Sequence, residues 1–165
     1  MKGARLVPAG NGDSNVATGL PVLDHLLSRL ARAGRFDLAL EIAPDEPEAE
    51  VDAAGEALGA AVGPLLAEGA HGVGIMPAEE ALATVVVEAS GRALVASNVD
   101  LGPSRVGGLD TDLAARFLRS LAQAAGLTIH VRLIEGEDTD HVLEAIFKAL
   151  GVALAQATAA TRGEE

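Results

Sequence analysis

Hydrophobic side chains recur with two different spacings along the chain, and these spacings predict its helices and strands. Apolar residues three or four positions apart, typical of helices that bury one face, occur in 18–34, 45–62, 113–125 and 140–157. Alternating or clustered apolar residues predict strands at 5–7, 36–42, 82–88, 93–99 and 127–133. Ser90-Gly91-Arg92 is expected to turn between two of these strands.

Glycine and proline interrupt the periodic segments at three places. Residues 8–16 are expected to form a mobile turn after the first short strand. A glycine-rich connector is expected to carry His71 and the Met76-Pro77-Ala78-Glu79-Glu80 segment. A second connector is expected to contain Gly102, Pro103, Gly107 and Gly108.

The order helix, strand, helix occurs twice. A shift of 91 positions lays the apolar residues of the strand 36–42 on those of the strand 127–133, and it also aligns the helices on either side. This repeat predicts a single α+β domain, residues 1–165, with two pseudo-symmetric halves at about 1–75 and 76–165 and a sheet packed against helices. The alternative is a chance match between helices rich in alanine and leucine.

Composition narrows the classes of partner. The chain has 24 acidic and 12 basic residues, and its net charge of −12 disfavours nucleic acid and anionic membrane surfaces. The absence of cysteine excludes disulfides and thiolate chemistry, which suits a reducing cytoplasm. No apolar run approaches the roughly 20 residues that span a bilayer. We therefore expect a soluble, cytoplasmic protein with no membrane partner.

The helix 140–157 carries the most reactive polar stripe. At 100° per residue, His141 and Lys148 lie within about 20° of each other and Glu144 lies about 60° away. A histidine and a glutamate three residues apart can bind one metal ion. The alternative is a surface pair, with Glu144 and Lys148 forming an ion pair of a few tenths of a kcal/mol.

Three separated motifs resemble imidazoleglycerol-phosphate dehydratases, the hydro-lyases of histidine biosynthesis. They are Thr18-Gly19-Leu20-Pro21-Val22-Leu23-Asp24-His25-Leu26-Leu27, Ser90-Gly91-Arg92 and the stretch from Glu144 to Leu150. The resemblance covers about residues 18–157 and implies a fold like domain 2 of ribosomal protein S5. It also implies a large symmetric homo-oligomer with active sites between subunits, a small phosphorylated imidazole as substrate, and two manganese ions held by His-His-x-x-Glu motifs.

The resemblance assigns roles to six residues. They are Glu80 as the catalytic acid that moves the proton, Arg92 and Lys148 as ligands of the substrate phosphate, and His25, His141 and Glu144 as a partial metal site. His130 is retained on the polar side of its strand, and its role, like that of His71, is left open.

The metal motifs depart from the family pattern. Asp140 replaces the first histidine of the second motif, and Glu48, Ala49 and Asp52 replace both histidines and the glutamate of the first. Manganese binds imidazole ligands more readily than harder ions such as Mg²⁺ do, and most of the motif imidazoles are replaced here. Binding of manganese is therefore expected to be weak or absent. Dehydration of imidazole glycerol phosphate is therefore a doubtful activity, and the alternative is a non-catalytic homologue that binds a phosphorylated ligand or acts in assembly. Glu48, Asp52 and Glu56 share one helical face, where their mutual repulsion costs a few tenths of a kcal/mol per pair unless a cation or basic partner lies opposite; the alternative is a merely solvated face.

Overall fold

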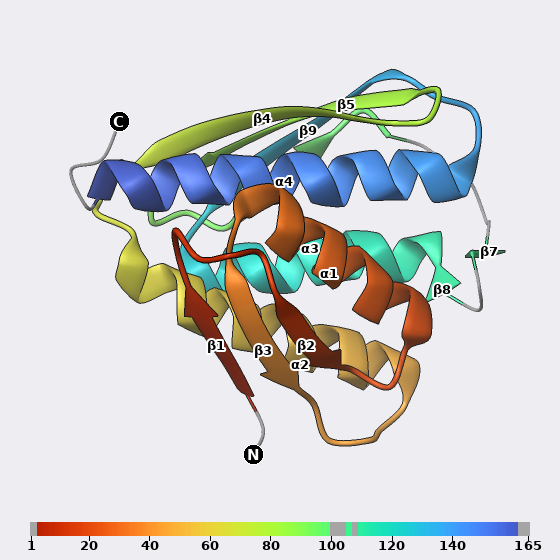
Figure 1. The fold of residues 1–165 in the computed structure, drawn as a ribbon, viewed down its shortest axis with the longest axis horizontal. Coiled ribbons are helices and arrows are strands. Elements are labelled where there is room, and N and C mark those ends of the chain that lie inside the picture. The colour runs from red at the N-terminus through yellow and green to blue at the C-terminus, as the bar shows by residue number, and fades with distance from the viewer. Residues whose placement is uncertain (1–2, 100–104, 107–108, 162–165) are drawn as a thin grey trace.

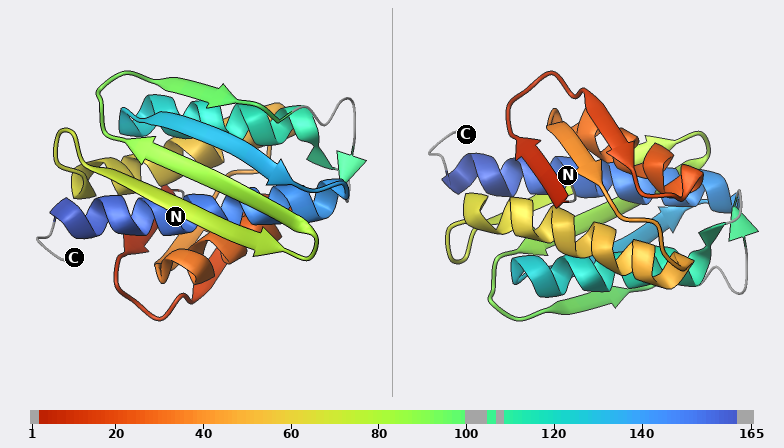
Figure 2. Two further views of the ribbon diagram at one scale, coloured as in Figure 1. Left: turned by 90° about the horizontal axis from the view of Figure 1, so that it is seen from above. Right: turned by 90° about the horizontal axis from the view of Figure 1, so that it is seen from below.

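Helices packed between two sheets make up the protein (Figure 1). This computed structural model describes residues 3–99, 105–106 and 109–161. A four-stranded sheet covers one side of the helices and a three-stranded sheet covers the other, as the two views in Figure 2 show. The α+β class and the packing of sheets against helices are as predicted.

The first half contains β1 (Gly3–Val7), β2 (Ser14–Ala17), α1 (Pro21–Gly34), β3 (Asp37–Glu41) and α2 (Pro47–Val62), followed by a 3-10 turn at Gly63–Leu65. Both helices begin at a proline, whose fixed φ suits the first helical position. The helix α1 ends at Arg35, which adopts a left-handed φ of 57° and donates its N–H to carbonyls of the last turn. The strand β3 alternates buried and exposed residues, as its pattern predicted.

The second half contains β4 (His71–Ala78), β5 (Ala81–Glu88), β6 (Leu94–Ser97), β7 (Arg105–Val106), β8 (Leu109–Asp110), α3 (Thr111–Ala125), β9 (Thr128–Glu135) and α4 (Thr139–Thr161). All four predicted helices are present. The second predicted connector, with Gly102, Pro103, Gly107 and Gly108, lies outside the described residues.

The glycine-rich stretch around His71 is a strand, so its prediction as a connector was wrong. Gly72 and Gly74 are buried where β4 crosses α4. A β-carbon would lie 2.1 Å from the carbonyl oxygen of Ala153 at the first glycine and 2.0 Å from that of Ala149 at the second. The alternate glycines therefore allow close approach of strand and helix, which is one reason for glycine inside a strand.

Two further differences concern strand order. β5 and β6, which the turn at 90–92 joins, are not neighbours, because β9 lies between them in the order β4-β5-β9-β6. The expected mobile turn at 8–16 gives way at its end to β2, a short and mostly exposed strand that pairs in parallel with β3. A four-residue strand without apolar alternation leaves little signal in the sequence.

Each half pairs its strands in the same register. Leu6 of β1 lies opposite Leu38 of β3, and Val87 of β5 lies opposite Ile129 of β9, so a shift of 91 relates the two central strands. In each half a further strand pairs in parallel with the central strand, β2 with β3 and β6 with β9. The strand β4 has no counterpart in the three-stranded sheet. Superposition of the two halves stays a prediction.

Each half also packs its second helix on the first helix of the other half. A β-carbon at Gly151 of α4 would lie 2.2 Å from the carbonyl oxygen of Leu30 in α1, and one at Gly59 of α2 would lie 3.1 Å from that of Leu121 in α3. Leu30 and Leu121 differ by the shift of 91, whereas Gly59 and Gly151 differ by 92. The prediction of one constant shift was therefore wrong for the second helices, which a single extra residue separates.

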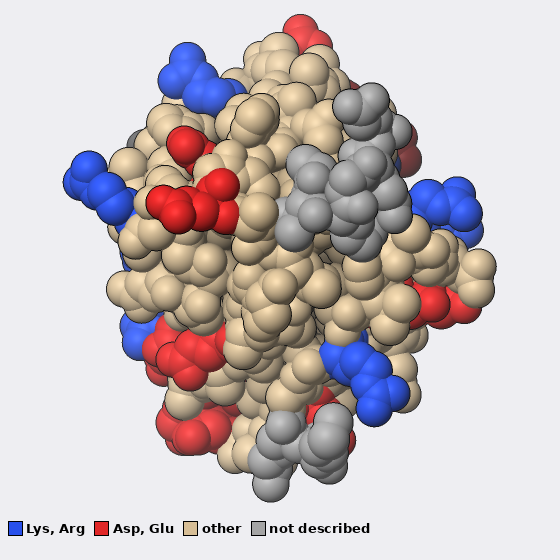
Figure 3. Space-filling model, turned by 90° about the vertical axis from the view of Figure 1, so that its left-hand side faces the viewer, with Lys and Arg blue, Asp and Glu red and all other residues tan. Residues whose placement is uncertain are grey.

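The helix α4 forms the centre of the core. Residues 139–159 are long and apolar enough to cross a bilayer by composition alone, but 67% of the 18-residue window that meets this test is buried inside the protein. The rings of Phe117 and Phe147, from α3 and α4, pack with centroids 5.5 Å apart. On the face drawn in Figure 3, acidic and basic side chains lie in small separate groups among uncharged ones.

Candidate functional site

The tip of the β4–β5 hairpin contacts the first turn of α4. Glu80 lies in this turn, next to Glu79 with its left-handed φ of 51°. One carboxylate oxygen of Glu80 lies 2.6 Å from Nδ1 of His141. The other accepts hydrogen bonds from the backbone N–H groups of Glu137 at 3.1 Å and Asp138 at 2.9 Å. Two candidate residues far apart in the sequence thus form one pair.

Asp138 positions this end of α4. Its Oδ1 accepts hydrogen bonds from the backbone N–H groups of Asp140 at 3.0 Å and His141 at 3.3 Å, so it acts as an N-terminal cap. Sequence reasoning missed this residue. The available signal was an aspartate directly before an apolar helical pattern.

The electrostatics of the pair assign the proton to the imidazole. The hydrogen bond from the Asp138 N–H, followed by those from His141 and from the Glu137 N–H, lowers the pKa of Glu80 to about 2. The hydrogen bond to Glu80 raises the pKa of His141 above its ordinary value. Glu80 is therefore the acceptor and His141 the donor near neutral pH.

Changing Glu80→Gln should lower the pKa of His141, because the amide carries no negative charge to stabilise the imidazolium. The folded-state pKa of His141 is raised, so its contribution to stability is complete below its ordinary pKa of 6.5 and disappears as the pH rises through the raised value. The contribution of Glu80 to stability is complete above its ordinary pKa of 4.5 and disappears as the pH falls through its lowered pKa of about 2. Titration of the His141 ring followed by NMR measures the shift.

The matched control for this titration is Glu79→Gln, which removes the neighbouring charge but leaves the Glu80 hydrogen bond in place. It should change the pKa of His141 much less, since the Glu79 charge is the smallest of the influences on that group. Equal effects of the two changes would contradict a specific Glu80–His141 bond.

Glu144, on the next turn of α4, faces α1 instead of the hairpin. Its Oε1 lies 3.5 Å from Nε2 of His25 and 2.9 Å from Nε of Arg29. The contact with Arg29 is an ion pair without hydrogen-bond alignment. The predicted partial metal site is thus divided, because His141 bonds Glu80 while Glu144 and His25 form a second pair.

The carboxylate at the glutamate position of the first metal motif is bound by side chains of α3 in the same chain. Asp52 of α2 accepts hydrogen bonds from Nε and Nη2 of Arg116 on α3, both at 2.8 Å, and from Oγ of Ser120 at 2.9 Å. This arginine is a basic partner opposite the acidic helical face of α2. Its guanidinium holds the pKa of Asp52 below the usual range, and the carboxylate raises the pKa of Arg116.

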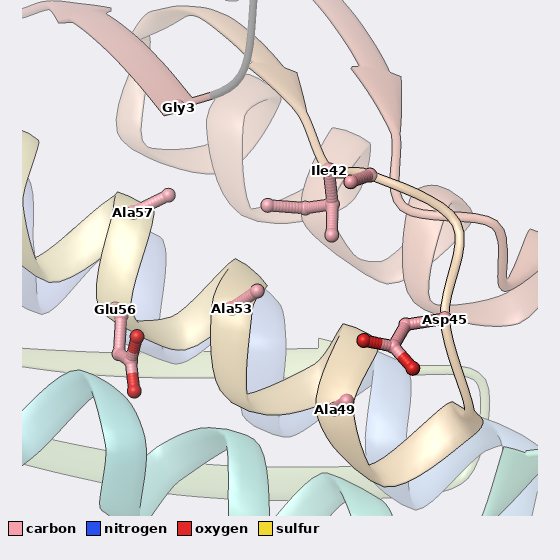
Figure 4. Close-up of a pocket in the computed structure, with 8 residues that line it drawn as sticks. Gly3, Ile42, Asp45, Ala49, Ala53, Glu56 and Ala57 are labelled. Carbon is pink, nitrogen blue, oxygen red and sulfur yellow. The ribbon is translucent and has the colours of Figure 1, made fainter.

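The other side of α2 offers the carboxylates of Glu56 and nearby Asp45 but no imidazole. Ala49, which stands at a motif histidine position, lines a shallow depression together with Ala53 and Ala57 (Figure 4). Ile42 faces these methyl groups, and the carboxylate of Asp45 lies at one end. A surface of methyl groups cannot replace the missing imidazoles.

The two predicted phosphate ligands do not meet within one chain. Nζ of Lys148 donates a hydrogen bond to the carbonyl oxygen of Pro77, 2.6 Å away, at the hairpin end of β4. Arg92 follows β5 at the opposite end, and the six residue steps from Leu82, opposite Pro77, to Glu88 span about 20 Å. Their role as ligands of one substrate phosphate stays a prediction, and within one chain the two cations are far apart.

The donors of one chain do not fit two manganese ions. In the part of the chain that the structure describes, no group of three or more histidine, aspartate or glutamate side chains is placed to hold a metal ion. Exposed His71 and His130 lie on β4 and β9, away from the Glu144 pair. Both motif carboxylates, Glu144 and Asp52, contact an arginine.

Comparison with known proteins gives one consistent result. The sequence profile of the family described as imidazoleglycerol-phosphate dehydratase matches residues 18–154. Imidazoleglycerol-phosphate dehydratase from Pelobacter propionicus is 38% identical over 156 residues, which cover 90% of this chain and 80% of that protein. The corresponding protein of Desulforudis audaxviator is 39% identical over 155 residues, covering 90% and 79%.

The fold agrees with a solved structure as well. The crystal structure of imidazoleglycerol-phosphate dehydratase from Staphylococcus aureus superposes with a TM-score of 0.82 at 31% sequence identity. The superposition covers 93% of this chain and 91% of that one.

Proposed function

Because the chain belongs to the imidazoleglycerol-phosphate dehydratase family of histidine biosynthesis, we propose that it removes water from a small phosphorylated imidazole, imidazole glycerol phosphate. The observation that carries this proposal is the Glu80–His141 pair at the hairpin tip. An ionised carboxylate that holds an imidazolium is a common arrangement for proton transfer.

Loss of water breaks a C–O and a C–H bond, so the leaving hydroxyl group must receive a proton and the neighbouring carbon must give one up, its electron pair forming the new double bond. His141 supplies the proton to the hydroxyl group, since its pKa is raised and its ring is half-exposed beside the hairpin, and the neutral ring that results can accept the proton from carbon, which restores the imidazolium. Glu80 is a poor proton acceptor at a pKa of about 2, so it orients and charges the imidazole. This assignment differs from the sequence hypothesis, in which Glu80 itself moved the proton.

A turnover assay tests the proposal directly. The purified protein, with and without added Mn²⁺, is mixed with imidazole glycerol phosphate, and formation of the keto product is measured. Turnover that disappears in His141→Gln supports the proposal. Binding without turnover under both conditions contradicts it.

The second candidate is a non-catalytic relative that binds the same class of ligand. The specific observation in its favour is the Asp52–Arg116 contact, which occupies the first motif, together with Ala49 at a histidine position. Binding of imidazole glycerol phosphate without turnover would select this function.

Phosphate recognition is proposed to combine Arg92 of one chain with Lys148 of another. Within one chain, Lys148 reaches the hairpin end of the four-stranded sheet and Arg92 lies at its opposite end. Each of Arg92→Ala and Lys148→Ala should weaken binding of imidazole glycerol phosphate by about 1.5–3 kcal/mol, the range for a charge-assisted hydrogen bond. Calorimetry measures the loss. Arg35→Ala, which removes an exposed arginine at the end of α1, is the control and should leave the affinity unchanged.

Such a shared site requires a homo-oligomer. The outer face of the four-stranded sheet exposes Val73, Ile75 and Val86, which are 41%, 58% and 37% accessible. Light scattering at micromolar concentration should therefore give a mass of several chains. A monomer at that concentration would rule out a site shared between copies.

A further inference from the structure

The two contacts between halves carry charged side chains at equivalent positions. The shift of 91 that relates α1 to α3 takes His25 to Arg116 and Arg29 to Ser120. The shift of 92 that relates α2 to α4 takes Asp52 to Glu144. The Glu144–His25–Arg29 cluster and the Asp52–Arg116–Ser120 cluster therefore occupy the same place in the two halves.

The chemistry of the two clusters differs. At Glu144 the carboxylate faces the imidazole of His25 at 3.5 Å and Nε of Arg29 at 2.9 Å without hydrogen-bond alignment, and imidazole with carboxylate is a donor pair that divalent metals use. At Asp52 both carboxylate oxygens are engaged by the fork of one guanidinium, at 2.8 Å each. A guanidinium has no lone pair to offer a metal, and its positive charge repels one.

We propose that Arg116 is a built-in cation that takes the place of a divalent metal ion at Asp52, so that this half of each chain binds no such ion. The hydroxyl of Ser120 completes the contact by donating to Asp52 at 2.9 Å. The forked geometry fixes the guanidinium in the plane of the carboxylate, as in the stronger class of ion pair. This inference holds whether or not the chain dehydrates a substrate.

Counting bound Mn²⁺ by electron paramagnetic resonance tests the proposal. The full-length wild-type chain should bind at most one ion, and Asp52→Asn should leave that number unchanged. Arg116→His restores in this half the imidazole and carboxylate pair of the other half, so it should add one further ion per chain. The added ion should disappear again when Asp52→Asn is combined with Arg116→His.

Arg119→Ala is the matched control, because it removes an exposed positive charge from the same helix without touching the fork. It should add no ion. Two results would overturn the proposal: a wild-type chain that loses an ion on Asp52→Asn, or a folded Arg116→His chain that gains none. The first result needs only the wild-type protein and the Asp52→Asn variant, so it can overturn the proposal even if the Arg116→His variant does not fold. Neither readout depends on turnover, so failure here is separate from failure of the dehydratase proposal.

Discussion

Gly74→Ala is expected to destabilise the protein by about 3 kcal/mol or more, at or beyond the upper end of the range for overpacked cores. The new methyl group would lie 2.0 Å from the carbonyl oxygen of Ala149, which belongs to the backbone of α4 and cannot rotate away. Either β4 separates from the helix or the helix shifts in the core. Urea unfolding followed by circular dichroism measures the loss.

Gly63→Ala is the control, since its new methyl group would meet only atoms 3.8 Å or farther away and its φ of −48° suits alanine. It should be neutral or stabilising by up to about 1 kcal/mol. Similar unfolding midpoints for Gly74→Ala and Gly63→Ala would show that β4 and α4 are not in close contact.

Glu80→Gln is expected to lower kcat/KM for imidazole glycerol phosphate by roughly 100-fold, the lower end of the range for general acid–base groups. The amide keeps an acceptor for the backbone N–H groups of Glu137 and Asp138 but loses the charge that holds the imidazolium. As the pKa of His141 falls, the alkaline limb of the pH–rate profile should move to lower pH. This displacement separates an effect on proton transfer from a general loss of structure.

Glu79→Gln serves as the control for the rate as well, because this neighbouring carboxylate should leave both the rate and the alkaline limb nearly unchanged. Steady-state kinetics across the pH range compare the two variants. A Glu80→Gln enzyme with a wild-type rate and profile would remove the Glu80–His141 pair from the mechanism.

The helices could be predicted because their apolar spacing reports burial directly. The strand β4 could not, because its buried face consists of glycines, whose burial depends on a helix some 75 residues later in the chain. A local pattern gives no information about such a contact. The small residues of β4 therefore look like a flexible connector in the sequence.

The candidate site was predictable by residue type but not by pairing. Motif resemblance singled out Glu80, His141 and Glu144, yet the bonds that divide them depend on which turn of α4 faces the hairpin and which faces α1. Arg116 was missed because it belongs to no motif. The available signal was the repeat itself, which places this arginine where the first half has His25.

The double attachment of the β4–β5 hairpin to α4 has a consequence for motion. Glu80 joins the hairpin to the helix N-terminus, and Lys148 joins it two turns later through the Pro77 carbonyl. Because close backbone contact at Gly74 prevents α4 from sliding along β4, separation of the Glu80 carboxylate from His141 requires the hairpin tip to move away from the helix. Hydrogen exchange at the Asp138 amide should therefore report this movement.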